Sequence, residues 1–252
     1  MEILELLKYN PGNPVLFNSV LFFFLFSVVY VLYTALSSNI KARNGLLLIF
    51  SVYFYYKISG EYLGILLAVG IIDYLMGKLI AREKSLLRKR FFLAISVVTN
   101  VGILIYFKYT FFIVNQFGLQ SSQFFSYFAR EILTPVGISY YIFKSLGYTL
   151  ALYREEIEKA EENLLTYLLY VSFFPTIVAG PISKADNLLP QFNAPTNITR
   201  ENVSKGFYLL ITGTLKRVLI ADFIALNFVD RVFENPDLFT SFECLMAGYG
   251  AF

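Results

Sequence analysis

The chain has 252 residues, of which 57% are hydrophobic and only 15% are charged, with a formal net charge of +3 and a mean hydropathy of +0.60. A soluble domain carries about 25% charged residues because its surface faces water, so this composition excludes a soluble protein and predicts an exterior that faces lipid. The small net charge, with no basic block interleaved with stacking aromatics, excludes a nucleic-acid partner.

The residue types exclude several chemistries as well. The chain contains no histidine and one cysteine, Cys244. Histidine is the usual general base near neutral pH and a common metal ligand, and one cysteine cannot form an internal disulfide or a cysteine-cluster metal site. We therefore expect no metal, no cofactor and no His-dependent chemistry within these 252 residues.

Apolar stretches of about 20 residues, long enough to cross a bilayer core of about 30 Å as a helix, recur along the chain. Residues 16–36 form the first, and the short aromatic stretch 46–56 predicts a half-length or tilted helix. Further stretches cover residues 62–80, 91–114, 132–152, 164–180 and 206–228. The last of these contains Lys216, Arg217 and Asp222, so we expect it to lie partly in the membrane interface.

The chain closes on an apolar run that begins near Phe242 and stops at Phe252 in mid-span. We therefore expect residues 1–252 to form a single membrane domain that is incomplete at its C-terminus. The fold class predicted is all-α, a polytopic transmembrane helical domain. Before that run, Thr199 is a predicted helix cap at the end of the one long polar stretch.

Basic residues predict how the spans are oriented, because loops rich in lysine and arginine stay in the cytoplasm. Six of them lie from the end of the span 62–80 to the start of the span 91–114, namely Lys78, Arg82, Lys84, Arg88, Lys89 and Arg90. This places residues 78–90 inside, with Lys41 and Arg43 on the same side. By alternation, residues 116–130 lie outside and residues 154–162 lie inside.

Two spans carry a charge that a membrane interior penalises. Asp73 lies about two turns from the cytoplasmic end of its span, so we expect it to be satisfied by reaching the interface or by pairing with Lys78. Lys144 lies deep in the span 132–152, where Gly137, Tyr141, Lys144 and Tyr148 share one helical face. Either Lys144 extends to an interface and the tyrosines join helices, or this face lines a polar passage.

Proline and glycine interrupt two of the spans. Pro135 and Gly137 weaken the helix ladder where the span 132–152 begins, and Pro175, Gly180 and Pro181 predict a broken helix and a turn in the span 164–180. Irregular backbone at membrane depth is tolerated against protein or a water-filled cavity. The second break either ends a span or forms one wall of a buried substrate passage.

These interrupted segments carry a family resemblance. Residues 135–141 read Pro-Val-Gly-Ile-Ser-Tyr-Tyr and resemble the Pro-(Val/Ile)-Gly-Ile-Ser-Phe-Tyr stretch of bacterial membrane-bound O-acyltransferases. Residues 174–182 and 189–192 resemble that family's Phe-Pro…Ala-Gly-Pro…Pro-Gln signature, and residues 153–154 and 213–222 resemble its Tyr-Arg and Gly…Lys…Ala-Asp stretches. The likeness is to the branch of alginate O-acetylases and D-alanyl transfer proteins, and it is strong from about residue 133 to 222.

The sequence departs from the family pattern at Tyr140, where Phe is usual, at Ile142, where Thr is frequent, and at Lys144, where Gln or Glu is usual. The resemblance also implies a catalytic Trp-His pair and a second histidine, which would lie beyond Phe252. No residue of this chain is therefore assigned a catalytic role. The substrate-passage candidates are Pro135, Gly137, Tyr141, Lys144, Tyr148, Pro175, Gly180 and Pro181.

The resemblance implies a function for the complete protein. It would move an acyl group, expected to be acetyl, from a cytoplasmic thioester or carrier protein to hydroxyls of an extracellular polysaccharide or another cell-envelope polymer. Membrane lipid and extracytoplasmic acetylation partners are further expected contacts, and the setting is a bacterial inner (plasma) membrane crossed several times. Residues 1–252 alone are expected to be inactive.

Two other functions stay open at this stage. A transporter or flippase also uses broken helices and charges at the membrane midplane, but it would predict an inverted internal repeat, and the sequence shows no repeat. A truncated, non-catalytic homologue would bind partners without chemistry.

Overall fold

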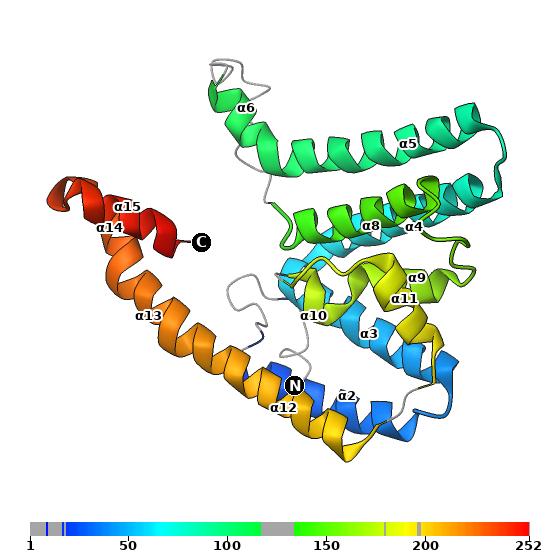
Figure 1. Ribbon diagram of the computed structural model, residues 1–252, viewed down its shortest axis with the longest axis horizontal. Coiled ribbons are helices and arrows are strands. Elements are labelled where there is room, and N and C mark those ends of the chain that lie inside the picture. Colours follow the sequence, from blue (N-terminus) through cyan, green and yellow to red (C-terminus); the bar gives the residue numbers. More distant parts are fainter. Residues whose placement is uncertain are drawn as a thin grey trace. The chain divides into compact units, whose positions relative to one another are not determined.

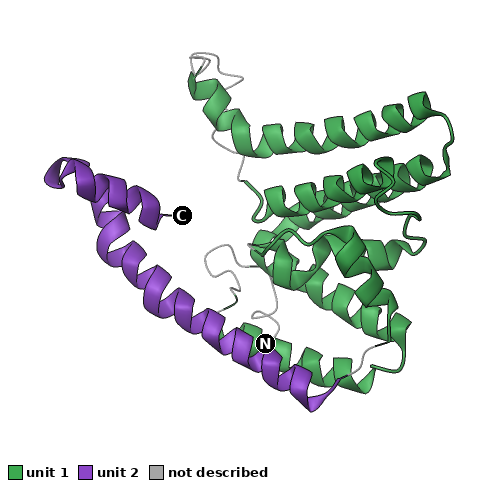
Figure 2. Ribbon diagram, viewed as in Figure 1, with its two compact units in different colours: residues 1–196 green, residues 197–252 purple. Residues whose placement is uncertain are grey.

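The computed structural model describes residues 9, 17, 19–116, 134–178, 180–195 and 198–251. The chain divides into two compact units, Met1–Thr196 and Asn197–Phe252 (Figure 2). No strand occurs in the described ranges, so the expectation of an all-helical fold is confirmed for them. One membrane domain over residues 1–252 stays a prediction.

Unit 1 is a set of helices packed side by side (Figure 1). In chain order it contains α2 (Val20–Ala35), α3 (Ile40–Ser59), a 3-10 turn (Gly60–Tyr62), α4 (Leu63–Arg82), α5 (Leu86–Leu104), a π-helical turn (Ile105–Tyr109), α6 (Thr110–Gln116), α8 (Ile138–Tyr153), α9 (Leu164–Ser172), α10 (Phe174–Ile177) and α11 (Ala185–Asn193). Helix α4 packs against both α5 and α8, and α3 packs against α9.

The helix boundaries agree with the apolar pattern except in one early span. The stretch 46–56 does not form a half-length helix, because α3 is 20 residues long. It begins where the Asn39 side chain accepts from the Ala42 amide, and it ends at Gly60, which has φ of 57°. Four polar residues near the ends of α3 made the apolar stretch look short, but they are buried inside the unit and do not end the helix, namely Arg43, Asn44, Lys57 and Ser59.

Two helical stretches of the described chain are long and apolar enough to cross a membrane, Ile40–Arg82 and Leu86–Gln116. The first consists of α3 and α4 joined by the 3-10 turn. A shorter apolar helix, α2, exposes large side chains such as Phe24 and Val31. These outward apolar surfaces fit a helical protein whose exterior meets lipid.

The span 164–180 is broken, as its prolines predict. Helix α9 has nine residues, about 14 Å of rise and only half of a bilayer core. The chain leaves the helix at Phe173 and resumes for the four residues of α10, with Pro175 in its first turn. Residues 180–184, just before α11, have no regular structure. The span 132–152 likewise becomes helical only at Ile138, after a turn at Gly137.

Contacts between loops show which helix ends lie together. Lys89 forms an ion pair with Glu155 at 2.8 Å and thereby holds the pKa of that carboxyl below its usual value. Tyr74 and Lys78 donate to the Glu162 carbonyl. Residues 78–90 and 154–162, both predicted to be cytoplasmic, therefore meet at one end of the helices in unit 1.

Unit 2 is a helical run with two π-helical turns. It contains α12 (Arg200–Lys216), a π-helical turn (Arg217–Ala221), α13 (Asp222–Ile224), a second π-helical turn (Ala225–Val229), α14 (Asp230–Glu234), a 3-10 turn (Pro236–Leu238) and α15 (Ser241–Gly250). The Thr199 hydroxyl accepts from the Asn202 amide at 3.2 Å, so the predicted cap is confirmed. Arg217 and Asp222, both exposed, pair at 4.0 Å.

Candidate functional site

The turn before α8 brings the backbone of the two interrupted segments close together. Gly137 has φ of 75°, in the left-handed region that favours glycine. A Cβ atom at this position would lie 2.2 Å from the Ile177 carbonyl oxygen, far inside contact distance. Glycine therefore allows the start of α8 to lie directly against the end of α10.

Lys144 lies where these segments meet, about two turns further along α8. Its side chain is only 3% exposed, and its ammonium donates to the Thr176 hydroxyl at 3.0 Å. The same nitrogen lies 4.8 Å from the ring centroid of Tyr170 and 6.0 Å from that of Phe173. A cation over aromatic faces in a desolvated site is stabilised by about 2 kcal/mol.

Tyr170 ties the backbone of both segments together. Its hydroxyl lies 3.1 Å from the Lys144 carbonyl oxygen and 3.2 Å from the Ser183 carbonyl oxygen, so these two acceptors share its one hydrogen. The helix that carries Lys144 and the chain that follows Pro181 are thus joined through one buried side chain. This contact fixes the backbone position of Lys144 as well as its side chain.

The members of the predicted common face that lie within α8, namely Tyr141, Lys144 and Tyr148, are buried. Tyr141 and Tyr148 are both 0% exposed, and Lys144 lies between them. Tyr141 packs edge to face on Tyr55 at 6.1 Å, and its hydroxyl has no hydrogen-bond partner among the described residues. Tyr148 packs on Tyr167 at 4.7 Å and accepts from the Glu161 amide, so it belongs to the end of α8 where residues 154–162 lie.

The proline and glycine candidates fall into two groups. Pro135 is buried and Gly137 half-buried at the start of α8, whereas Pro175 and Pro181 are exposed. Gly180 is half-buried, and a Cβ there would lie 2.5 Å from the Thr176 Cα, so the chain folds back tightly after α10. The structure brings Gly137 and Lys144 together with the segment around Thr176, and it keeps Tyr148 apart from them.

Asp73 anchors a second buried polar cluster. Its carboxylate is 0% exposed and accepts from Ser96 at 2.6 Å, from Asn100 at 2.7 Å and from Ser145 at 2.5 Å. The prediction that Asp73 reaches the interface or pairs with Lys78 is wrong, since Lys78 donates to the Glu162 carbonyl instead. Helices α5 and α8 place these donors around a carboxylate that α4 carries.

The cluster extends through hydroxyl groups. Ser96 lies 3.1 Å from the Thr149 hydroxyl, and Ser145 lies 3.0 Å from the Tyr167 hydroxyl. Helix α9 thereby joins the other three. The sequence contained a signal for this cluster, because Ser96 and Asn100 are two polar residues of an apolar span and lie one helical turn apart.

The segment 189–192 is held through its backbone. Arg43, only 1% exposed, donates to the Phe192 carbonyl oxygen at 2.6 Å, and Asn44 donates to the same atom at 3.0 Å. This oxygen belongs to the last turn of α11, where carbonyl groups lack partners within the helix. Two polar residues of α3 therefore satisfy the end of α11.

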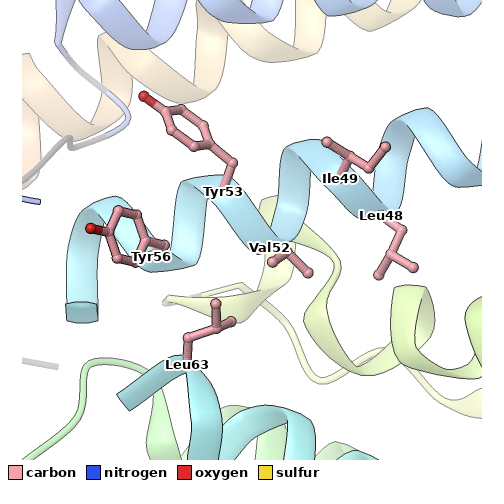
Figure 3. Close-up of a pocket in the computed structure, with 6 residues that line it drawn as sticks. All are labelled: Leu48, Ile49, Val52, Tyr53, Tyr56 and Leu63. Carbon is pink, nitrogen blue, oxygen red and sulfur yellow. The ribbon is translucent and has the colours of Figure 1, made fainter. Parts of the chain in front are cut away.

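An apolar cleft of about 480 Å³ lies on another part of unit 1 (Figure 3). It is lined by Leu48, Ile49, Val52, Tyr53, Tyr56 and Leu63, from α3 and the first residue of α4. None of the eight passage candidates lines this cleft. The surface that these side chains present to the cleft is apolar.

Comparisons with known proteins give relatives for nearly the whole chain. It is 33% identical to a probable alginate O-acetylase of Azotobacter vinelandii over 88% of this chain and 44% of that protein. It is 33% identical to the corresponding protein of Pseudomonas aeruginosa over 87% of this chain and 42% of that protein. A peptidoglycan O-acetyltransferase of Helicobacter pylori is 28% identical over 87% of this chain and 47% of its own length.

The chain thus spans about half the length of the curated relatives it matches. No family model and no solved structure matches it. The relatives are named for O-acetylation of a polymer, and the transporter or flippase alternative is not favoured by them.

Proposed function

Because this chain belongs to the membrane-bound O-acyltransferase family, we propose that it forms part of an enzyme that acetylates hydroxyl groups of a cell-envelope polymer or extracellular polysaccharide. One observation carries the proposal. Between 87% and 88% of the chain aligns with each of several relatives named for O-acetylation of two different polymers, alginate and peptidoglycan. The reaction is common to these names, whereas the acceptor differs.

The proposed donor is an acetyl thioester, free or on a carrier protein, on the cytoplasmic side. An acceptor hydroxyl attacks the acyl carbon, and a base removes the hydroxyl proton as the new ester bond forms. The 252 residues contain no histidine, so the histidine base that the family resemblance implies belongs to another part of the protein. The residues of this chain would position the acyl group and exclude water.

The membrane arrangement is part of the proposal. We place the enzyme in the bacterial inner membrane as a multi-pass protein, with residues 78–90 and 154–162 in the cytoplasm. The ion pair between Lys89 and Glu155 supports one common side for both loops. Membrane lipid, the acyl donor, the acceptor polymer and extracytoplasmic acetylation partners are its proposed contacts.

Activity is tested by acetyl transfer from a radiolabelled thioester to polymer in membranes that contain the full protein. The expected result is labelled polymer whose label is released by mild alkali, as an ester requires. Purified residues 1–252, assayed in parallel, should give only background transfer because they lack the base. Transfer by residues 1–252 alone would contradict this placement of the base, and no transfer by the full protein would contradict the function.

Topology is tested by labelling single cysteines in intact cells. The chain has one native cysteine, so Cys244→Ser provides the background, into which Ser85→Cys or Ser121→Cys is introduced. A membrane-impermeant maleimide should label position 121 only. Labelling of position 85 alone would reverse the orientation.

A further inference from the structure

The ammonium of Lys144 has hydrogen-bonding capacity that the described chain leaves unused. A lysine side chain offers three N–H donors, and one acceptor is present, the Thr176 hydroxyl at 3.0 Å. The other neighbours are the ring faces of Tyr170 and Phe173. No ion pair within the described part of the chain includes Lys144, so the remaining N–H groups can donate to a bound molecule.

This donor is held in place from both sides. Thr176, which accepts from Lys144, donates its own hydroxyl hydrogen to the Phe173 carbonyl at 3.2 Å. On the other side, Tyr170 holds the Lys144 backbone carbonyl, and the Gly137 turn lies against Ile177. A donor fixed before the reaction in a water-excluded site stabilises developing negative charge better than one that must reorganise.

We infer that Lys144 donates a hydrogen bond to the carbonyl oxygen of the acyl group while it is transferred, an inference that rests on the proposed function. As the acceptor oxygen bonds to the acyl carbon, the π electron pair of the carbonyl moves onto its oxygen. The resulting oxyanion lies within reach of the Lys144 ammonium. Collapse re-forms the carbonyl and breaks the carbon–sulfur bond of the thioester donor.

All atoms and electrons of this step are accounted for by the thioester donor, the acceptor hydroxyl and the base. The hydroxyl proton leaves through the base and ends on the departing thiolate, so the products are an ester and a thiol. Lys144 keeps its protons throughout, because its role is to donate a hydrogen bond. Removal of one such donor from an acyl-transfer site lowers kcat by about 100- to 1,000-fold.

Kinetics of the full protein in detergent or native membranes test this assignment. Lys144→Met keeps the length of the side chain and removes every donor, so kcat should fall about 100-fold while KM for the polymer stays unchanged. Lys144→Gln keeps an N–H donor and should retain kcat within about 10-fold of the parent. Lys108→Met is the matched control, since it removes an exposed lysine from the neighbouring helical stretch, and it should leave both constants unchanged.

A second variant separates positioning from folding. Thr176→Val removes the acceptor that holds the Lys144 ammonium but leaves the donors, so kcat should fall by less than in Lys144→Met, again at constant KM. Should Lys144→Met fail to accumulate in the membrane, the kcat values of Thr176→Val and Lys144→Gln, compared with that of the parent, test the role of Lys144 instead.

Three results would overturn the assignment while leaving the proposed function intact: parental kcat in Lys144→Met, a change in KM alone, or an equal loss in the Gln and Met variants. If Lys144→Met does not accumulate, parental kcat in Thr176→Val overturns it in the same way. An inactive parent would instead refute the proposed function.

Discussion

Unit 1 buries an acid and a base in membrane-depth helices, and it treats them differently. Asp73 has three donors from the chain on its two oxygens. Lys144 has one acceptor and two aromatic faces. Both side chains are almost or completely excluded from solvent, at 0% and 3% exposure. The two sites therefore differ in how far the protein itself satisfies the buried group.

That difference separates a structural role from a ligand-binding one. A buried polar group whose partners all come from the chain joins the helices that supply them. A buried donor with spare capacity costs stability unless something else accepts from it. The Asp73 cluster therefore stabilises the packing of four helices, and the Lys144 cluster has capacity for a substrate.

The largest effect is expected where backbone approaches backbone beside Lys144. In Gly137→Ala the added methyl group would lie 2.2 Å from the Ile177 carbonyl, at a φ of 75° that alanine rarely adopts. The turn must move, so we expect a loss of about 3 kcal/mol or more in stability and a loss of the Thr176 contact.

The measurement is the melting temperature of purified protein, with Gly147→Ala as the control. Gly147 lies within the same helix, and a Cβ there meets nothing within 4 Å. Equal melting temperatures for the parent and Gly137→Ala would show that this close approach is not needed for the site.

The next largest effect is expected at Asp73, whose carboxylate accepts three hydrogen bonds from the chain. Asp73→Leu removes three accepted hydrogen bonds, each of which contributes about 0.6 kcal/mol between membrane helices, so a loss of about 2 kcal/mol is expected. Asp73→Asn keeps the shape and an acceptor oxygen and should lose less than half as much. Thermal unfolding in detergent measures both, and a larger loss in Asn than in Leu would contradict a hydrogen-bonding role.

Lys144 should behave in the opposite way in the same assay. Lys144→Met removes one hydrogen bond and the contact with the Tyr170 ring, but it also removes the cost of burying an ammonium. These terms offset, so stability should change by less than about 1 kcal/mol. A destabilisation as large as that of Asp73→Leu would mean that Lys144 is structural and would end the contrast between the two sites.

The sequence predicted the more regular features of this arrangement. The lengths of the apolar stretches predicted most helices. Pro135, Gly137 and Pro175 predicted the breaks, because proline and glycine disturb a helix at their own position in the sequence. The common buried face of α8 followed from helical spacing alone. What spacing could not give is which residue of another helix meets that face, so Thr176 and Tyr170 were missed as partners of Lys144.

The error over Asp73 has the same origin. Lys78 is the cation nearest to it in sequence, yet the lysine points to Glu162 and packs on the Tyr74 ring at 4.5 Å. Ser96, Asn100 and Ser145 become neighbours of Asp73 only when α5 and α8 pack on α4. The length of α3 was underestimated because its polar ends are buried by tertiary packing, which local hydropathy does not register.

The smallest effect is expected at the exposed ion pair of Lys89 and Glu155, where water competes with the partner. Lys89 lowers the pKa of Glu155 in the folded protein. A depressed folded pKa contributes stability above the unfolded value of about 4.3, and this contribution is lost as pH falls through the folded pKa. Glu155→Gln should therefore lower the melting temperature by at most about 2 °C at pH 7, and the melting temperatures of parent and variant should converge below about pH 4.

Glu158→Gln, which removes an exposed acid of the same loop, is the matched control and should show no such pH-dependent difference. A loss of stability in Glu155→Gln as large as that in Asp73→Leu would contradict this argument. It would mean that burial does not decide which polar contacts of this protein are strong.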